Sequence, residues 1–201
     1  MSTLKDIIHQ NKNFKEFALG YGRHISQLLE KLDTDSLEKI VDGFNEARLK
    51  SKTIFVIGNG GSAASASHMA NDLALGPRHH HEGTLRVVAL TDNVPVLTAT
   101  GNDLGYEQIF LRQLKVYYRP GDQLLVISAS GNSSNLINSA QWVKAQGGTV
   151  WGFLGFDGGQ LKALCDAAVV VKTAPGEYGP VEDVHMVLDH LLTAWFYARM
   201  A

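Results

Sequence analysis

Residues 53–75 read TIFVIGNGGSAASASHMANDLAL, and this stretch predicts a strand, a glycine turn and the start of a helix. The apolar, β-branched run from Ile54 to Ile57 is too short for a helix and is typical of a buried parallel strand. Glycines within residues 58–61 then break the strand, and small residues follow at a density that suits a helix. Such a turn directs backbone N–H groups and the positive end of the helix toward one point, where an anion such as a phosphate would be held.

This turn differs from the two best-known phosphate-binding loops. Its glycines do not match the dinucleotide fingerprint G-x-G-x-x-G, and no Gly-Lys-Ser/Thr follows as in a Walker loop. Any α/β protein needs glycine where a strand turns into a helix, so the glycines are equally compatible with a plain turn. Ser62, Ser65 and Ser67 favour the phosphate interpretation, because a helix start does not require three hydroxyls.

Composition and charge narrow the class of protein. The chain has 201 residues, 18 of them basic and 20 acidic, which is enough for one domain with a full core and gives a net charge of −2. Because no basic stripe stands out, we expect neither nucleic acid nor a membrane as a direct partner. The single cysteine, Cys165, excludes internal disulfides and fits a reducing compartment. The polar N-terminus and the lack of an apolar run that could span a bilayer predict a cytoplasmic protein.

Residues 3–50 are predicted to form two amphipathic helices ahead of the α/β core. Apolar residues recur at helical spacing between Phe14 and Leu29, and residues 33–36 interrupt them with typical capping side chains. The apolar faces of these helices must pack either on the chain's own sheet or on another subunit.

Strands are predicted to alternate with helices along the rest of the chain. After the first strand, further strands are expected at residues 85–90, 123–127, 149–154 and 167–172. Helices are expected at residues 94–116, with an irregular middle, at 135–146, and from Pro180 to about Arg199. This alternation predicts an α/β protein with a doubly wound, parallel, five-stranded sheet.

A second predicted strand-to-helix turn is also rich in hydroxyls. Residues 128–133 read SASGNS and follow the predicted third strand. Ligands in this architecture bind in the crevice at the carboxyl ends of the strands, where the two turns would converge. One N-cap would account for one of these serines. Six hydroxyls over both turns instead predict a phosphate cradle that holds its anion by N–H dipoles and hydroxyls, since neither turn offers Lys or Arg.

Imidazoles and carboxylates are spaced to share a helix face in two places. His68 and Asp72 are four residues apart on the first core helix, although such a pair is more often simply solvated. On the last helix, Glu182 and His190 lie within about 80° of each other on a helical wheel. Spacing favours an alternative stripe equally well, made of Glu182, His185 and Asp189.

These features together resemble a known family. The two serine turns, His68, the EDVH segment at residues 182–185 and His190 are similar to the sugar isomerase (SIS) fold, which binds phosphorylated sugars. Within it, the pattern most resembles the phosphoheptose isomerases, which interconvert sedoheptulose 7-phosphate and glycero-manno-heptose 7-phosphate. The resemblance covers nearly all of residues 1–201 as one SIS domain. It implies a homotetramer with active sites between subunits, residues 1–50 as oligomerisation helices and residues 51–201 as the phosphosugar-binding core.

The resemblance also implies roles for individual residues. It places the substrate phosphate on Ser62, Ser128, Ser130 and Ser133. It implies further substrate contacts from Asn59, Gly60, Asp103 and Glu182. Asp72 and His190 match the positions of the catalytic carboxylate and the catalytic histidine. Some members bind zinc, and the matching positions are His68, Asp72, Glu182 and His190; no nucleotide cofactor is implied.

The chain departs from the family pattern at both carboxylate positions. Asp72 is one methylene shorter than the usual Glu, and Glu182 replaces a Gln. Two carboxylates and two imidazoles are all ligand types that zinc accepts, so the departures favour metal binding and weaken the usual assignment of the base. The arginine that often follows the catalytic acid is not matched locally. His79, His80 and His81 could contact a metal, but we expect them rather to lie in a solvated loop.

The leading hypothesis from these residues is aldose–ketose isomerisation through a cis-enediol. A carboxylate (Asp72) and an imidazole (His190) suit the required proton transfers, because burial and mutual contact can bring both toward neutral pKa. One alternative is a non-catalytic SIS protein of regulation or assembly, like the type that bridges copies of the bacterial replication initiator. The presence of both His68 and His190 argues against it, because a scaffold needs neither imidazole. Another alternative is an isomerase of a different phosphosugar in a polysaccharide pathway, whereas a heptose product would serve lipopolysaccharide or capsule synthesis.

Overall fold

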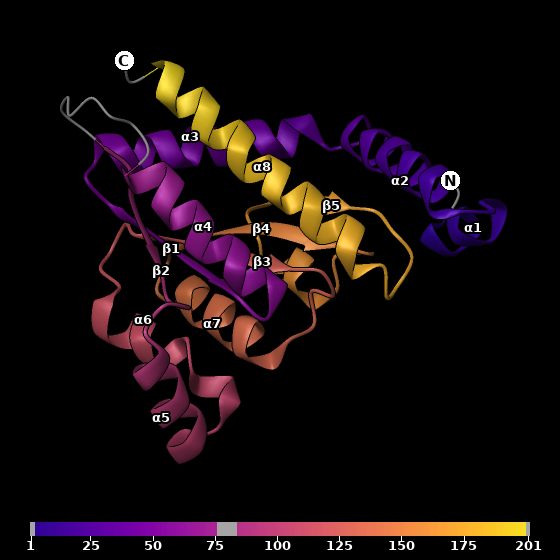
Figure 1. The fold of residues 1–201 in the computed structure, drawn as a ribbon. Helices are drawn as coiled ribbons and strands as arrows, with labels where there is room; N and C mark the ends of the chain where they lie inside the picture. The colour runs from indigo at the N-terminus through magenta and orange to yellow at the C-terminus, as the bar shows by residue number, and fades with distance from the viewer. Residues whose placement is uncertain (1–2, 76–83, 200–201) are drawn as a thin grey trace.

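The computed structural model describes residues 3–75 and 84–199, which form a five-stranded sheet with helices on both faces (Figure 1). Its strands are β1 (Thr53–Gly58), β2 (Arg86–Ala89), β3 (Gln123–Ser128), β4 (Thr149–Gly155) and β5 (Ala167–Val171). Neighbouring strands are all parallel, in the order β2-β1-β3-β4-β5. The predicted α/β class and the doubly wound parallel sheet are therefore confirmed. The predicted loop with His79, His80 and His81 lies outside the described residues.

Helices follow the strands in the predicted places. The helices are α1 (Leu4–Gln10), α2 (Phe14–Leu29), α3 (Thr34–Leu49), α4 (Gly61–Leu75), α5 (Val94–Leu104), α6 (Leu111–Tyr117), α7 (Ser134–Ala145) and α8 (Tyr178–Arg199). Two short 3-10 turns are η1 (Tyr106–Gln108) and η2 (Gln160–Ala163). The predicted helix at 94–116 is divided into α5, η1 and α6, in agreement with its irregular middle.

The N-terminal segment forms three helices where the sequence predicts two. Asn11 is extended and ends α1, and the Asn13 side chain accepts a hydrogen bond from the Glu16 N–H (3.0 Å) to begin α2. Asp33 caps α3 in the same way by accepting the Ser36 N–H (3.1 Å), at the interruption that the sequence indicates. The first break was missed because α1 has only 7 residues, too few for apolar periodicity to appear.

Successive strand residues face opposite sides of the sheet and so build two core layers. On one side, Val56 packs with Met69 of α4 and Leu188 of α8, in a layer that α3 also covers. On the other side, the next residue, Ile57, packs with Leu136 of α7. Full burial of an apolar side chain of this size contributes about 1.5–3 kcal/mol. The first of these layers holds α4 and α8 side by side on the same face of the sheet (Figure 1).

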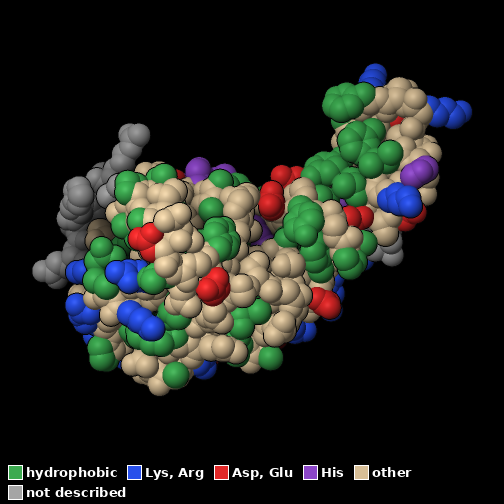
Figure 2. All heavy atoms as spheres, turned by 90° about the horizontal axis from the view of Figure 1, so that it is seen from below, with side chains coloured by type: hydrophobic (Ala, Val, Ile, Leu, Met, Phe, Trp, Pro, Cys, Tyr) green, Lys and Arg blue, Asp and Glu red, His purple; other side chains and the backbone are tan. Residues whose placement is uncertain are grey.

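The two N-terminal helices α1 and α2 extend away from the sheet as an arm, whereas α3 belongs to the core (Figure 1). Hydrophobic side chains gather on the surface of this arm (Figure 2). Among them, Phe14 is 81% exposed, and Ile8 and Leu19 are more than half exposed. The Tyr21 hydroxyl connects α2 to α8 by a hydrogen bond to Asp183 (2.5 Å). No helix within the described ranges is long and apolar enough to cross a membrane.

Candidate active site

The two serine turns lie side by side because they follow β1 and β3, which are neighbours in the sheet. In the second turn, the Ser128 hydroxyl is buried and accepts the Gly131 N–H (3.0 Å). The Ser130 hydroxyl accepts the Asn132 N–H (3.3 Å). These two hydroxyls therefore shape the loop on which they stand.

The start of η2 and the loop before it hold the second turn in place. The Leu161 N–H donates to the Gly131 carbonyl (3.0 Å), and the Gln160 N–H donates to Asn132 Oδ1 (3.1 Å). Gly131 has a φ of +65°, and a Cβ on it would lie 2.0 Å from the carbonyl oxygen of Gly158. Only glycine fits this close approach, so the turn is fixed by its backbone.

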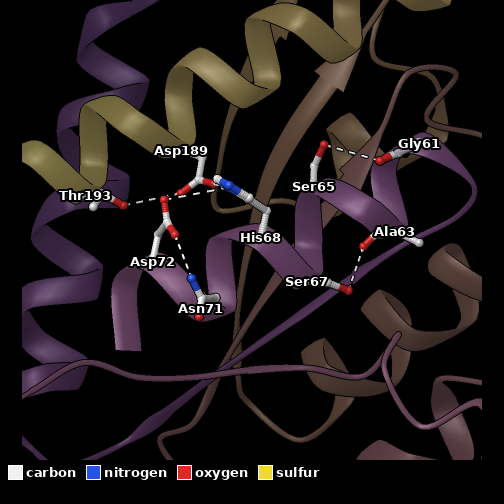
Figure 3. A network of polar contacts seen from close by, with 9 residues as sticks. All are labelled: Gly61, Ala63, Ser65, Ser67, His68, Asn71, Asp72, Asp189 and Thr193. Carbon is white, nitrogen blue, oxygen red and sulfur yellow. Dashed lines mark hydrogen bonds and ion pairs between the residues drawn. The ribbon is translucent and has the colours of Figure 1, made fainter. Parts of the chain in front are cut away.

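The six serine hydroxyls of the two turns divide into different uses. The Ser65 and Ser67 hydroxyls donate to carbonyls one helical turn back, on Gly61 and Ala63 (3.3 and 3.1 Å; Figure 3). Ser67 also bonds to Thr91 at the end of β2. The Ser65 and Ser67 hydroxyls therefore donate within the protein. The sequence counted all six hydroxyls toward the phosphate, whereas these two have their protons already engaged.

Two hydroxyls make no hydrogen bond among the described residues, and those of Ser128 and Ser130, which only accept one, keep their O–H for a ligand. In the part of the chain that the structure describes, no hydrogen bond engages the side chains of Ser62 and Ser133. Ser62 is a buried residue in the first turn of α4. Ser133 stands at the N-cap of α7, yet its side chain does not cap that helix. A hydroxyl in the first turn of α4 and one at the N-cap of α7 are well suited to an anion, because helix N-termini also supply N–H groups and positive dipole ends.

Asn59 connects the first turn to the other side of the sheet. Its side-chain amide exchanges two hydrogen bonds with that of Asn135 on α7 (3.0 and 2.8 Å). The Tyr106 hydroxyl donates to Asn59 Oδ1 (3.0 Å). Asn135 and Tyr106 were not identified from the sequence, because nothing local to either residue indicates this partner.

The centre of the candidate site is a cluster of two imidazoles and two carboxylates between α4 and α8. One donor atom from each of His68, Asp72, Asp189 and His190 lies within 4.8 Å of the other three. His68 Nδ1 is 2.9 Å from Asp189 Oδ2 and 3.7 Å from Asp72 Oδ2 (Figure 3). The His68 and His190 rings meet edge to face, with their centroids 5.4 Å apart. The cluster thus joins residues 121 positions apart in the chain.

Burial and contact shift the pKa of two members of this cluster, His68 and Asp189. The hydrogen bond with Asp189 raises the pKa of His68 above its ordinary value, and the charge of Asp72 adds to this effect. Burial raises the pKa of Asp189, although the His68 bond opposes the shift. The histidines and Asp72 remain open to solvent, whereas the Asp189 side chain is 0% exposed. A substrate could therefore reach three members of the cluster directly.

The remaining candidate residues lie around this centre. The Glu182 carboxylate is not a member of the cluster and lies over Gly61, where a Cβ would be 2.4 Å from it. Asp103 is exposed on α5 and accepts the Asn102 side chain (2.8 Å). No hydrogen bond or ion pair within the described residues joins Asp103 to another candidate residue. Gly60 lies in the first turn with a φ of +57°, a conformation that favours glycine.

Spacing allowed two alternative stripes on α8, and the cluster includes one residue from each of them. His190 comes from the first stripe, and Asp189, which the sequence did not single out as a ligand, comes from the second. His185 faces the interior, where its Nε2 donates to the Leu154 carbonyl (3.2 Å). Adjacent residues 189 and 190 both reach the cluster, although one is buried and the other exposed.

The donor set of the cluster fits a metal ion. Imidazole nitrogens and carboxylate oxygens are common ligands of transition metals and zinc, and here four of them converge. The structure is therefore compatible with a metal at this place.

The chain is similar to proteins of known family. Residues 20–155 match the SIS domain family. The phosphoheptose isomerase of a Nitratiruptor species is 40% identical over 148 residues, which cover 73% of this chain and 77% of that protein. The phosphoheptose isomerase of Aneurinibacillus thermoaerophilus is 35% identical over 191 residues, or 95% of this chain and 90% of that protein.

Solved structures agree with these relatives. The phosphoheptose isomerase GmhA from Neisseria gonorrhoeae superposes with a TM-score of 0.80 at 27% identity, over 90% of this chain and 97% of that one. A phosphoheptose isomerase from Francisella tularensis, at 24% identity and a TM-score of 0.74, shares the fold over 96% of this chain and 97% of that one. The chain therefore belongs to the SIS domain family and, within it, to the phosphoheptose isomerases.

Proposed function

We propose that this protein is an aldose–ketose isomerase that converts sedoheptulose 7-phosphate into glycero-manno-heptose 7-phosphate through a cis-enediol. One observation supports this most strongly: a single helix, α4, connects the free hydroxyl of Ser62 with the cluster at His68. The helical rise between these residues is about 9 Å. A sugar whose phosphate and reacting carbons are at opposite ends of its chain matches such a site.

The phosphate would be bound mainly by neutral groups. Ser62 and Ser133 offer free hydroxyls, and Ser128 and Ser130, whose hydroxyls accept N–H bonds within their own turn, still have an O–H to donate to the anion. The starts of α4 and α7 add N–H groups and positive dipole ends. Such a site recognises the phosphate common to many sugars, so it does not by itself select a heptose.

The reaction requires two kinds of proton transfer. One group removes the proton from the carbon beside the carbonyl and returns it to the neighbouring carbon, and a second group moves protons between the two oxygens. We assign these roles to Asp72 and His190, which lie in one cluster and are both open to solvent. Groups of this kind typically accelerate such a step by about 10²–10⁴.

We further propose that the metal is zinc. His68, Asp72 and His190 would hold it, because they belong both to the set that the family resemblance implies and to the observed cluster. When bound, zinc would polarise the substrate carbonyl as a Lewis acid. The carboxylate of Glu182, the fourth residue of the implied set, lies over Gly61 instead.

We also propose a homotetramer in the cytoplasm with active sites between subunits. The arm of α1 and α2 supports this, since its exposed apolar side chains would be covered by another subunit. Because α3 packs into the core, the oligomerisation part of residues 1–50 would be α1 and α2. The core, residues 51–201, would bind the phosphosugar.

A test of this proposal measures turnover directly. Purified protein, stripped of metal with a chelator and then reloaded with zinc, is offered sedoheptulose 7-phosphate alongside other ketose phosphates, with formation of the aldose as readout. We expect turnover of the heptulose, loss with the chelator and recovery with zinc. If zinc-loaded protein turns over no ketose phosphate, the isomerase proposal fails and a regulatory SIS protein becomes the better interpretation. If the protein prefers another ketose phosphate, the isomerase proposal stands and only the assignment of the substrate is wrong.

A further inference from the structure

Asp189 is a buried carboxylate to which the family resemblance assigns no role. Its side chain is 0% exposed, and its Oδ2 is 2.9 Å from His68 Nδ1. The other oxygen, Oδ1, accepts a long hydrogen bond from the Thr193 hydroxyl (3.4 Å; Figure 3). Within the described residues, no Lys, Arg or backbone N–H contacts this carboxylate. Its one short hydrogen bond is therefore the bond to His68.

The distances separate a hydrogen bond from shared metal coordination. Ligand atoms about 2.0–2.1 Å from a tetrahedral zinc ion lie about 3.3–3.4 Å from each other. The 2.9 Å between His68 Nδ1 and Asp189 Oδ2 is shorter than this and falls within the range of N–H···O hydrogen bonds. The 3.7 Å between His68 Nδ1 and Asp72 Oδ2 is too long for a hydrogen bond. In this arrangement Nδ1 is occupied as a donor.

A neutral imidazole carries one N–H, so donation through Nδ1 leaves the lone pair of Nε2 free. We propose that Asp189 is a positioning residue that holds His68 in the Nδ1–H tautomer and so leaves Nε2 as the ring nitrogen that can bind a metal. Histidines that bind metal commonly donate their second ring nitrogen to a carboxylate in this way. The metal-binding consequence rests on the proposed function, whereas the tautomer is a property of the metal-free protein.

This assignment also lowers the number of metal ligands in the cluster from four to three. With Asp189 as the partner of His68, the ligand set reduces to His68, Asp72 and His190. Catalytic zinc sites typically have three protein ligands and leave a fourth position for water or substrate, whereas structural sites use all four. The buried position of Asp189 and the solvent access of the other three fit this division.

The decisive experiment is nitrogen NMR on metal-free protein labelled with ¹⁵N-histidine, at alkaline pH where the imidazoles are neutral. The resonances of His68 are assigned by their loss in His68→Gln. We expect His68 to carry its proton on Nδ1 in the wild type. In Asp189→Ala we expect a shift toward the Nε2–H form that free histidine favours. A wild-type His68 protonated on Nε2, or a tautomer unchanged in Asp189→Ala, overturns the proposal.

Zinc affinity, measured by competition with a chromophoric chelator, gives the second readout. We expect about 10- to 100-fold weaker binding in Asp189→Ala. Asp189→Asn keeps the shape and an acceptor oxygen and should lose less, which also guards against misfolding of the alanine variant. The control is Asp42→Asn, an exposed carboxylate on α3, with affinity within twofold of wild type.

X-ray absorption of the zinc-loaded proteins completes the test. We expect Asp189→Ala to keep the same number of protein ligands, which supports a positioning role. Loss of one oxygen ligand in that variant would make Asp189 a direct ligand and overturn the proposal. If wild-type protein binds no zinc at all, the proposed metal fails, and the NMR result alone still decides whether Asp189 sets the tautomer.

Discussion

The two halves of the candidate site are built in opposite ways. The proposed phosphate cradle consists of short contiguous segments at the ends of β1 and β3, and its residues are uncharged. The cluster consists of ionisable side chains from α4 and α8, and its closest contact joins residues 121 positions apart. Backbone geometry fixes the cradle, as the close approach at Gly131 illustrates. Packing between two helices fixes the cluster.

Because the two halves are built differently, we expect them to contribute to different steps of catalysis. A cradle of hydroxyls and N–H groups binds the same phosphate in substrate, intermediate and product, so it supplies uniform binding. The cluster meets the carbons at which bonds change, so its contribution is expressed in the transition state. Substitutions in the cradle should therefore act mainly on KM, and substitutions in the cluster should act mainly on kcat.

The largest effect is expected from His190→Gln. Because His190 is assigned both to proton transfer and to the zinc site, kcat should fall about 10²- to 10⁴-fold at matched zinc content while KM changes only a few-fold. Steady-state kinetics on zinc-loaded protein measure both. His9→Gln, at an exposed histidine on α1, is the matched control and should keep wild-type kcat. A kcat within threefold of wild type in His190→Gln would remove this residue from the chemistry.

His185, buried on α8 against β4, is expected to give the next largest effect. Burial lowers the pKa of this imidazole to about 4, against 6.5 for an ordinary histidine. The unfolded chain therefore binds the proton first as pH falls. The free energy of unfolding should lose about 3 kcal/mol between pH 6.5 and pH 4, and none of this loss should occur above pH 6.5.

Urea unfolding of metal-free protein across this pH range checks the effect of His185. His185→Gln keeps a donor for the Leu154 carbonyl but cannot titrate, so its stability should fall less steeply with acid. The difference between the two curves isolates the histidine from the carboxylates, which titrate in both proteins. Parallel curves would contradict the prediction.

The sequence predicted the fold and the two adjacent serine turns because both depend on neighbouring residues. Strands such as residues 54–57 are recognised by short β-branched runs, and the serine turns follow them directly. The seven-residue α1 was missed because two cap residues, Asn11 and Asn13, divide a segment too short to show its own period. A local sequence pattern is therefore enough to predict those elements whose structure depends on neighbouring residues.

The cluster could be predicted only in part, because it depends on how α8 is rotated against α4. Spacing left two stripes open on α8, and periodicity cannot say which of them faces the neighbouring helix. The structure resolves this by bringing both Asp189 and His190 to His68. Glu182 was expected among the metal ligands, and its carboxylate lies instead over Gly61, a contact that no spacing rule encodes.

Within the cradle, Ser133→Ala should raise KM about 10- to 100-fold, since a hydrogen bond to a charged group contributes about 1.5–3 kcal/mol. Its hydroxyl has no partner among the described residues, so the free energy of unfolding should not change. Competitive inhibition by inorganic phosphate should weaken by the same factor. Ser134→Ala, at the exposed next residue, is the control with unchanged KM. Equal losses in both variants would indicate a general effect on α7 rather than a phosphate contact.

The smallest effect is expected at Glu182, where the two halves meet. Its carboxylate lies over Gly61 at the start of α4 and so competes with a phosphate for the same positive helix end. Glu182→Gln keeps the hydrogen-bonding groups and removes the repulsion, which is worth about 0.5–1 kcal/mol at a partly exposed site, so KM should fall about two- to fivefold. Zinc affinity should stay within twofold of wild type, because Glu182 is not in the cluster. A marked loss of zinc affinity would instead place Glu182 among the metal ligands and join the two halves into one site.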